Sequence, residues 1–147
     1  MNIAIMVCGE FRWFDSFEKT FKSNLLPALQ GHNVQYFAHF WDQDLEQLSK
    51  FTDICNPIIT QFEKKPPTED VKKFFGNTKN LNSSLPNQAY GAHKSFLLLD
   101  EYQKQNNTTF DLYIKMRSDL AFVDKVNIDN FDNESVYVKD IVHWRPL

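Results

Sequence analysis

The sequence predicts an α/β fold: a mainly parallel, Rossmann-like sheet with helices on both faces. An apolar run, a segment with helical spacing of apolar residues and a second apolar run follow one another in the first 41 residues. This order is typical of a parallel crossover unit. The first run, Asn2–Cys8, is apolar almost throughout, as expected of a strand buried on both faces. No repeat or change of composition divides the 147 residues, so we expect one domain, 1–147.

The first strand is followed by signals for a helix and a second strand. Asp15 and Glu18 have the D-x-x-E spacing of a capping box, which predicts a helix with Asp15 as its N-cap. Four apolar residues then share one helical face: Phe17, Phe21, Leu25 and Leu29. Gly31 is typical of the residue that ends a helix, and Val34–Trp41 is expected to form the second strand.

The middle of the chain is less regular. Asp42–Phe51 is expected to form a short helix capped by Asp42. Pro57 interrupts the next apolar run, Ile54–Phe62, which favours a short or edge strand. A solvated loop is expected over Glu63–Asp70, followed by a short helical turn.

The last third begins with a long helix, expected over Asn87–Gln105. Three of its aromatic residues are expected to contact the core: Tyr90, Phe96 and Tyr102. Leu112–Met116 is a further strand, and the polar break Arg117–Asp119 follows it. Short strands are expected at Val136–Val138 and Ile141–Trp144.

Composition excludes several classes of function. The net charge of −3 gives no global positive field, so nucleic acid is not an expected partner. No apolar stretch approaches the roughly 18 residues of a membrane span. Cys8 and Cys55 are too few for a disulfide framework and lack zinc spacing, and a reducing cytoplasm is the default location.

Polar residues follow three of the expected strands directly, at residues 9–12, 39–42 and 117–119. In an open parallel sheet, ligands bind beyond the carboxyl ends of the strands. Gly9 allows a ligand to approach the backbone and Arg12 suits a phosphate, although a plain turn with a surface arginine fits the same residues. Asp42 suits a ribose or, alternatively, caps a helix. Lys94 reaches a phosphate or is simply solvated.

Arg117 and Asp119 are isolated charges in an otherwise apolar segment. A carboxylate after a buried strand can hold Mg²⁺ or Mn²⁺, with phosphate oxygens completing the shell. The alternative is a turn aspartate that pairs with Arg117 or Lys115. The sequence contains no zinc-hydrolase histidine spacing, no G-x-S-x-G, no Walker loop and no G-x-G-x-x-G.

Three segments carry a resemblance to a known family. I-A-I-M-V-C-G-E-F-R, Y-F-A-H-F-W-D and F-D-L-Y-I-K-M-R-S-D-L-A-F occur in the order found in bacterial and viral glycosyltransferase-like proteins. The resemblance covers residues 1 to about 125. It is to nucleotide-sugar transferases of the GT-A type, in which an acidic motif, often D-x-D, binds the donor diphosphate through a metal. Here the motif is R-S-D, with one carboxylate, and Lys115 stands where the family usually has its first arginine.

The resemblance implies a nucleotide-sugar-binding domain with a GT-A-like fold. It places Gly9, Arg12 and Asp42 near the nucleotide, and makes Asp119 the metal-binding acid, with Mg²⁺ or Mn²⁺ as cofactor. The sequence ends at Leu147, soon after Asp119, so a short or truncated C-terminal part is expected.

Three functions follow as hypotheses. The first is a glycosyltransferase of the hexosyltransferase kind, which moves a sugar from a nucleotide-diphosphate donor to a glycan, lipid or protein acceptor. No catalytic base is assigned. The second is a non-catalytic domain that binds a nucleotide or sugar. The third is a partner-binding protein that keeps the fold, with its 15% aromatic residues supplying a homo-oligomer interface.

Overall fold

The computed structural model describes residues 1–41, 45–74 and 85–131 and shows an α/β fold around one parallel sheet. Its strands are β1 (Asn2–Gly9), β2 (Asn33–Trp41), β3 (Ile59–Glu63) and β4 (Leu112–Arg117). They lie in the order β3-β2-β1-β4, and every neighbouring pair is parallel. The predicted α/β class and parallel sheet are confirmed.

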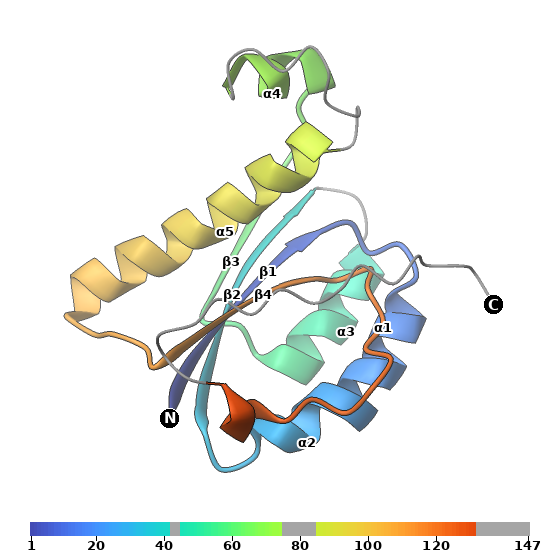
Figure 1. Cartoon of the computed structure of the whole chain (residues 1–147). Coiled ribbons are helices and arrows are strands. Elements are labelled where there is room, and N and C mark those ends of the chain that lie inside the picture. Colours follow the sequence, from blue (N-terminus) through green and yellow to red (C-terminus); the bar gives the residue numbers. More distant parts are fainter. Residues whose placement is uncertain (42–44, 75–84, 132–147) are drawn as a thin grey trace.

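Helices cover both faces of the sheet, as predicted (Figure 1). One face carries a continuous helix made of α1 (Phe14–Thr20), the π-helical segment η1 (Phe21–Leu25) and α2 (Leu26–Leu29), together with α3 (Leu45–Cys55). The long helix α5 (Leu85–Asn106) covers the other face.

Two short elements lie outside these layers. Helix α4 (Thr68–Phe74) packs against α5, and the 3₁₀ turn η2 (Ile128–Asn130) follows the loop after β4. No described helix is long and apolar enough to cross a membrane.

The core has two parts, one on each side of β1. Side chains alternate along a strand, so Ile3, Ile5 and Val7 face the α1 side while Ala4 and Met6 face α5. The α1-side cluster is rich in phenylalanine and includes Phe14, Phe17, Phe21, Phe40 and Phe51. This explains why the first strand is apolar at almost every position: both of its faces are buried.

The N-cap of the first helix lies two residues before Asp15, which the capping box predicts as N-cap. The helix begins at Phe14, and its N-cap is Trp13, in a left-handed conformation with φ of 62° and no side-chain cap hydrogen bond. Asp15 therefore lies in the first turn, where a carboxylate still interacts favourably with the helix dipole. Burial of Phe14 and Phe17 under the sheet outweighs the capping signal.

The π-helical segment has a local cause in Pro27. Proline has no N–H to donate to the carbonyl four residues earlier, so the regular helical ladder breaks there. The Leu26 N–H bonds instead to the Phe21 carbonyl, five residues back. The Asn24 carbonyl accepts a hydrogen bond from the Val126 N–H at 2.9 Å, which fixes the loop after β4 against this helix.

Three other sequence expectations need correction. The helix expected to end at Phe51 continues to Cys55, so Ile54 is helical and the third strand begins only at Ile59. The loop expected over Glu63–Asp70 is shorter than predicted, because β3 includes Glu63 and α4 begins at Thr68. Phe96, expected in the core, is 50% exposed. Asp42 and the strands expected at Val136–Val138 and Ile141–Trp144 lie outside the described residues.

Candidate functional site

Charged side chains gather where β1 and β4 end. The two strands are in register, with Cys8 opposite Arg117, so the turns that follow them lie side by side. Gly9 turns the chain with φ of 126°, a conformation that side-chain-bearing residues rarely adopt. The fully buried Ser118 ties the turns together, because its hydroxyl donates to the Glu10 carbonyl at 3.0 Å.

Asp119 and Arg117 form a bidentate pair at this edge. Arg117 Nε donates to Asp119 Oδ1 at 2.8 Å, and Arg117 Nη2 donates to Oδ2 at 2.6 Å. The hydrogen bonds to Asp119 raise the pKa of Arg117 above its ordinary value. Both side chains are largely buried, so each holds the other in one orientation.

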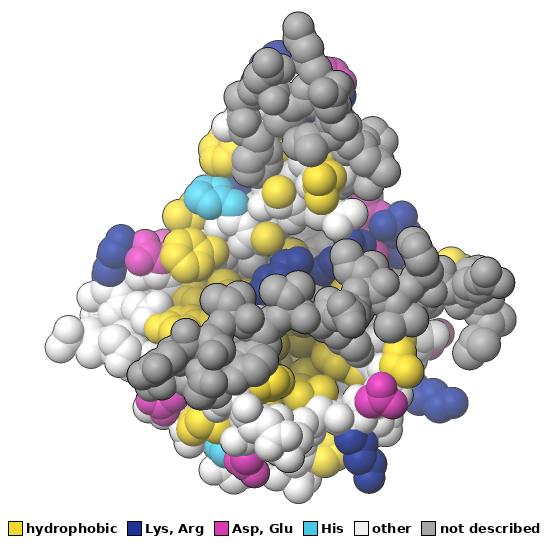
Figure 2. Space-filling view, viewed as in Figure 1, with side chains coloured by type: hydrophobic (Ala, Val, Ile, Leu, Met, Phe, Trp, Pro, Cys, Tyr) yellow, Lys and Arg dark blue, Asp and Glu magenta, His cyan; other side chains and the backbone are white. Residues whose placement is uncertain are grey.

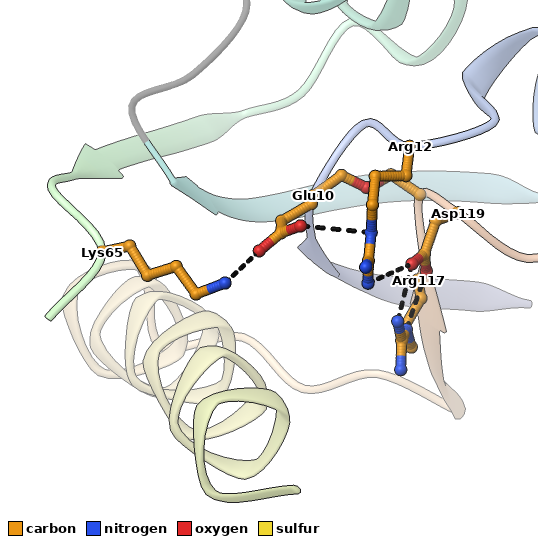
Figure 3. A network of polar contacts seen from close by, with 6 residues as sticks. Glu10, Arg12, Lys65, Arg117 and Asp119 are labelled. Atoms are coloured by element: carbon orange, nitrogen blue, oxygen red, sulfur yellow. Dashed lines mark hydrogen bonds and ion pairs between the residues drawn. The ribbon is translucent and has the colours of Figure 1, made fainter. Parts of the chain in front are cut away.

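Two further cations extend this pair into a row of side chains (Figure 3). Arg12 bridges the two carboxylates: its Nη2 lies 3.5 Å from Asp119 Oδ2, and its Nε lies 3.1 Å from Glu10 Oε2. Lys65, which follows β3, binds the other oxygen of Glu10. Three cations thus face two carboxylates, which leaves one positive charge in excess.

This row borders a pocket of about 100 Å³. The pocket takes side chains from the ends of β1, β2 and β4, from the turn after β3 and from the start of α5. Its lining residues are Cys8, Gly9, Glu10, Arg12, Trp41, Lys65, Asn87, Gln88, Gly91 and Arg117. Figure 2, viewed as Figure 1, shows Lys and Arg side chains near the middle of this face, bordered by hydrophobic side chains.

The α5 side of the pocket is uncharged and consists of Asn87, Gln88 and Gly91, which we call the amide wall. Asn87 is buried, and its Nδ2 donates to Thr68 Oγ1 at 3.3 Å. The Oδ1 atom of Asn87 is buried without a hydrogen-bond partner. Next to this wall, burial raises the pKa of the Cys8 thiol, which therefore stays protonated at neutral pH and is a poor nucleophile.

The structure brings most of the predicted site residues together. Gly9, Arg12 and Arg117 line the pocket, and Asp119 contacts both arginines. Lys94 belongs to a neighbouring cluster instead. Its Nζ lies 3.7 Å from Glu63 Oε2 and 5.3 Å from the centre of the Tyr90 ring, and it does not line the pocket.

The neighbouring cluster links β2, β3 and α5 through a buried histidine. His39 Nε2 lies 3.0 Å from Glu63 Oε1, and His39 Nδ1 is buried without a hydrogen-bond partner. Burial lowers the pKa of His39, while Glu63 acts in the opposite direction. Trp41 packs edge-on against His39 and stacks on Tyr90 at 5.9 Å between ring centres. Because Trp41 also lines the pocket, this cluster packs directly against the pocket wall.

Sequence reasoning missed several pocket residues. Lys65 follows the carboxyl end of β3, and applying the strand-end rule to that strand would have found it. Glu10 lies in the segment 9–12 that the strand-end rule selects, but nothing in the sequence indicates that it pairs with Arg12 and Lys65. Asn87 and Gly91 lie within a helix, so only the packing of α5 against β1 reveals them.

The hydrogen bonds that Asp119 accepts argue against the metal-binding role expected for it. Both of its oxygens already accept hydrogen bonds from guanidinium groups, which repel a cation. No group of three or more His, Cys, Asp or Glu side chains suited to a metal ion occurs among the described residues. As arranged, the described side chains do not fit Mg²⁺ or Mn²⁺ at Asp119, and the metal stays a prediction of the sequence.

We compared the chain with known proteins at the level of family, sequence and structure. No protein-family model, no curated protein and no solved structure matches it.

Proposed function

We propose that this domain binds the diphosphate of a nucleotide-sugar in the pocket and acts as the donor-binding part of a glycosyltransferase. The observation that carries the proposal is the excess of positive charge at the carboxyl edge of a parallel sheet, where such folds bind ligands. The resemblance of three sequence segments to nucleotide-sugar transferases supports the same class of ligand.

The cations differ in how readily they can turn to a ligand. Arg117 is fixed by its short bidentate bonds to Asp119. Arg12 has a side chain that is 63% exposed, and its contacts to Glu10 and Asp119 are longer. A phosphate oxygen in the pocket can therefore draw Arg12 away without leaving a carboxylate unpaired, because Asp119 keeps Arg117 and Glu10 keeps Lys65.

The proposed reaction is the transfer of a sugar to an acceptor hydroxyl. The acceptor oxygen forms a bond to the anomeric carbon, and the bond from that carbon to the diphosphate oxygen breaks. The bonding pair leaves with the diphosphate, whose charge Arg12, Arg117 and Lys65 offset. The acceptor proton passes to a base that the proposal leaves unassigned.

The proposal is tested by titrating the protein with uridine and guanosine diphosphate in a calorimeter. A charge-assisted hydrogen bond contributes about 1.5–3 kcal/mol, so Arg12→Ala is expected to weaken binding at least roughly tenfold. Lys104→Ala, which breaks a surface ion pair far along α5, is the matched control and should bind as wild type does. Equal affinity of Arg12→Ala and wild type would overturn the assigned pocket.

The metal-binding role of Asp119 is tested by repeating the titration with the chelator EDTA and with the Asp119→Asn variant. Nucleotide binding by wild type in EDTA, unchanged by added Mn²⁺, is expected if guanidinium and ammonium groups alone hold the diphosphate. Strong Mn²⁺ dependence that disappears in Asp119→Asn would instead support the metal role predicted from the sequence.

A non-catalytic binding domain is the second candidate, and one observation favours it. Glu10 is the only carboxylate among the described residues that line the pocket, and it is held by Arg12 and Lys65. A base for the acceptor hydroxyl is therefore not evident in this part of the chain. Nucleotide-sugar binding without transfer or donor hydrolysis over a panel of acceptors would favour this candidate over an enzyme.

A further inference from the structure

The amide wall opposite the cations suggests what the rest of the ligand is. The cation side of the pocket suits an anion, whereas Asn87, Gln88 and Gly91 carry no charge. We propose that the amide wall binds a hydroxyl group of the ligand, so that the pocket takes a sugar whose phosphate lies against Arg12, Lys65 and Arg117. This inference rests on the proposed function and adds to it the residues that recognise the sugar.

The unpartnered oxygen of Asn87 is the first observation. Asn87 is only 9% exposed and lines the pocket, and its Oδ1 has no hydrogen-bond partner. Buried polar atoms are almost always paired, and leaving one unpaired costs about 1–3 kcal/mol. An amide oxygen needs a donor. An ionised phosphate has no proton to give, whereas a sugar hydroxyl does.

Gly91 is the second, independent observation. It lies in the interior of α5, where glycine costs roughly 0.5–1 kcal/mol relative to alanine. An added Cβ would meet Cys8 Cβ at 3.6 Å and His39 Nδ1 at 3.8 Å, which is ordinary contact. Packing therefore does not require a glycine here. Gly91 and Cys8, which a Cβ at position 91 would contact, both line the pocket, so a side chain at position 91 would fill space at the pocket wall.

The size of the pocket agrees with a small group on this side. Its volume of about 100 Å³ is several times the roughly 10–15 Å³ that one water molecule needs on the same measure, so the pocket can hold a group larger than water.

The test compares two phosphate monoesters by calorimetry, glucose 1-phosphate and methyl phosphate. They share the anionic group, but methyl phosphate lacks hydroxyls. Wild type is expected to bind glucose 1-phosphate about tenfold more tightly, the effect of satisfying one buried acceptor. Asn87→Leu is expected to bring the two affinities together. Asn106→Leu, the same change at the other end of α5, is the control and should keep the preference.

Gly91→Ala provides a second test that does not depend on whether the fold tolerates leucine at position 87. Alanine strengthens the helix, so this variant is expected to fold, while its methyl group narrows the amide wall and reduces the preference for glucose 1-phosphate.

The outcomes separate this inference from the proposal beneath it. If methyl phosphate binds and Arg12→Ala weakens it, but neither Asn87→Leu nor Gly91→Ala changes the preference for the sugar, the amide wall is not the sugar site and the anion pocket stands. Equal binding of the two esters by wild type would likewise exclude the amide wall as the sugar site. If wild type binds neither ester nor a nucleoside diphosphate, the proposed function fails and this inference fails with it.

Discussion

His39 is a fully buried imidazole whose protonation is linked to the stability of the fold. Burial lowers its pKa below the usual value of about 6.5, despite the opposing effect of Glu63 and together with a smaller contribution from Lys94. Between the folded pKa and about 6.5, the unfolded chain therefore binds more protons than the folded one. The free energy of unfolding should fall as the pH is lowered through this range.

Urea denaturation at pH 7.5 and pH 5.5 checks this expectation. His39→Gln removes the titrating group, so its loss of stability between the two pH values should be smaller than that of wild type. An identical pH dependence in His39→Gln and wild type would mean that the pKa of His39 does not differ between the folded and the unfolded chain.

Among the residues of the candidate site, those that directly follow strands were predicted from the sequence. Those that reach the pocket only through the packing of a helix on the sheet were missed. Gly9, Arg12 and Arg117 were found because the strand-end rule needs only the order of elements. Asn87 and Gly91 were missed because their role depends on how α5 packs against β1. For Asp119, the geometry matches the alternative of a turn aspartate paired with Arg117.

Among the elements, the loop after β4 depends on the first helix for its position. Thr20 Oγ1 accepts a hydrogen bond from the Phe122 N–H at 3.0 Å, and Asn24 contributes hydrogen bonds to Phe122 and Val126. This loop continues from Asp119, so its attachment also supports the site. The contacts join segments about a hundred positions apart, and no local pattern in the sequence indicates them.

Thr20→Val tests this attachment with a side chain of nearly the same shape. It leaves the Phe122 N–H without its partner, and we expect the free energy of unfolding to fall by about 1–2 kcal/mol in urea denaturation. Thr20→Ser keeps the hydroxyl and should lose clearly less. If valine and serine have the same effect, the hydroxyl does not hold the loop.

Element boundaries show which local signals outweigh others. The capping box at Asp15 and Glu18 was overridden by burial of Phe14, and the apolar run beginning at Ile54 was divided between a helix end and an edge strand. Long periodic segments were more reliable. The helix expected over Asn87–Gln105 differs from α5 by two residues at its start and one at its end.

Across the whole molecule, β1 joins the two halves of the core. Adjacent residues on this strand, such as Ile5 and Met6, belong to opposite clusters. Loss of packing on either face therefore disturbs the same central strand. The sequence predicted this arrangement because a strand buried on both faces has to be apolar throughout.

Leu99→Ala tests whether the two faces unfold together. Leu99 on α5 is fully buried in the cluster opposite the phenylalanine-rich one, and its truncation is expected to cost about 2–5 kcal/mol. Phe96→Ala on the same helix removes an exposed ring and should change stability by about 0.5 kcal/mol or less. Because β1 couples the faces, helix content by circular dichroism and tryptophan fluorescence should decrease at the same urea concentration in Leu99→Ala. Separate transitions would show instead that the α5 side unfolds independently, which contradicts a single core joined through β1.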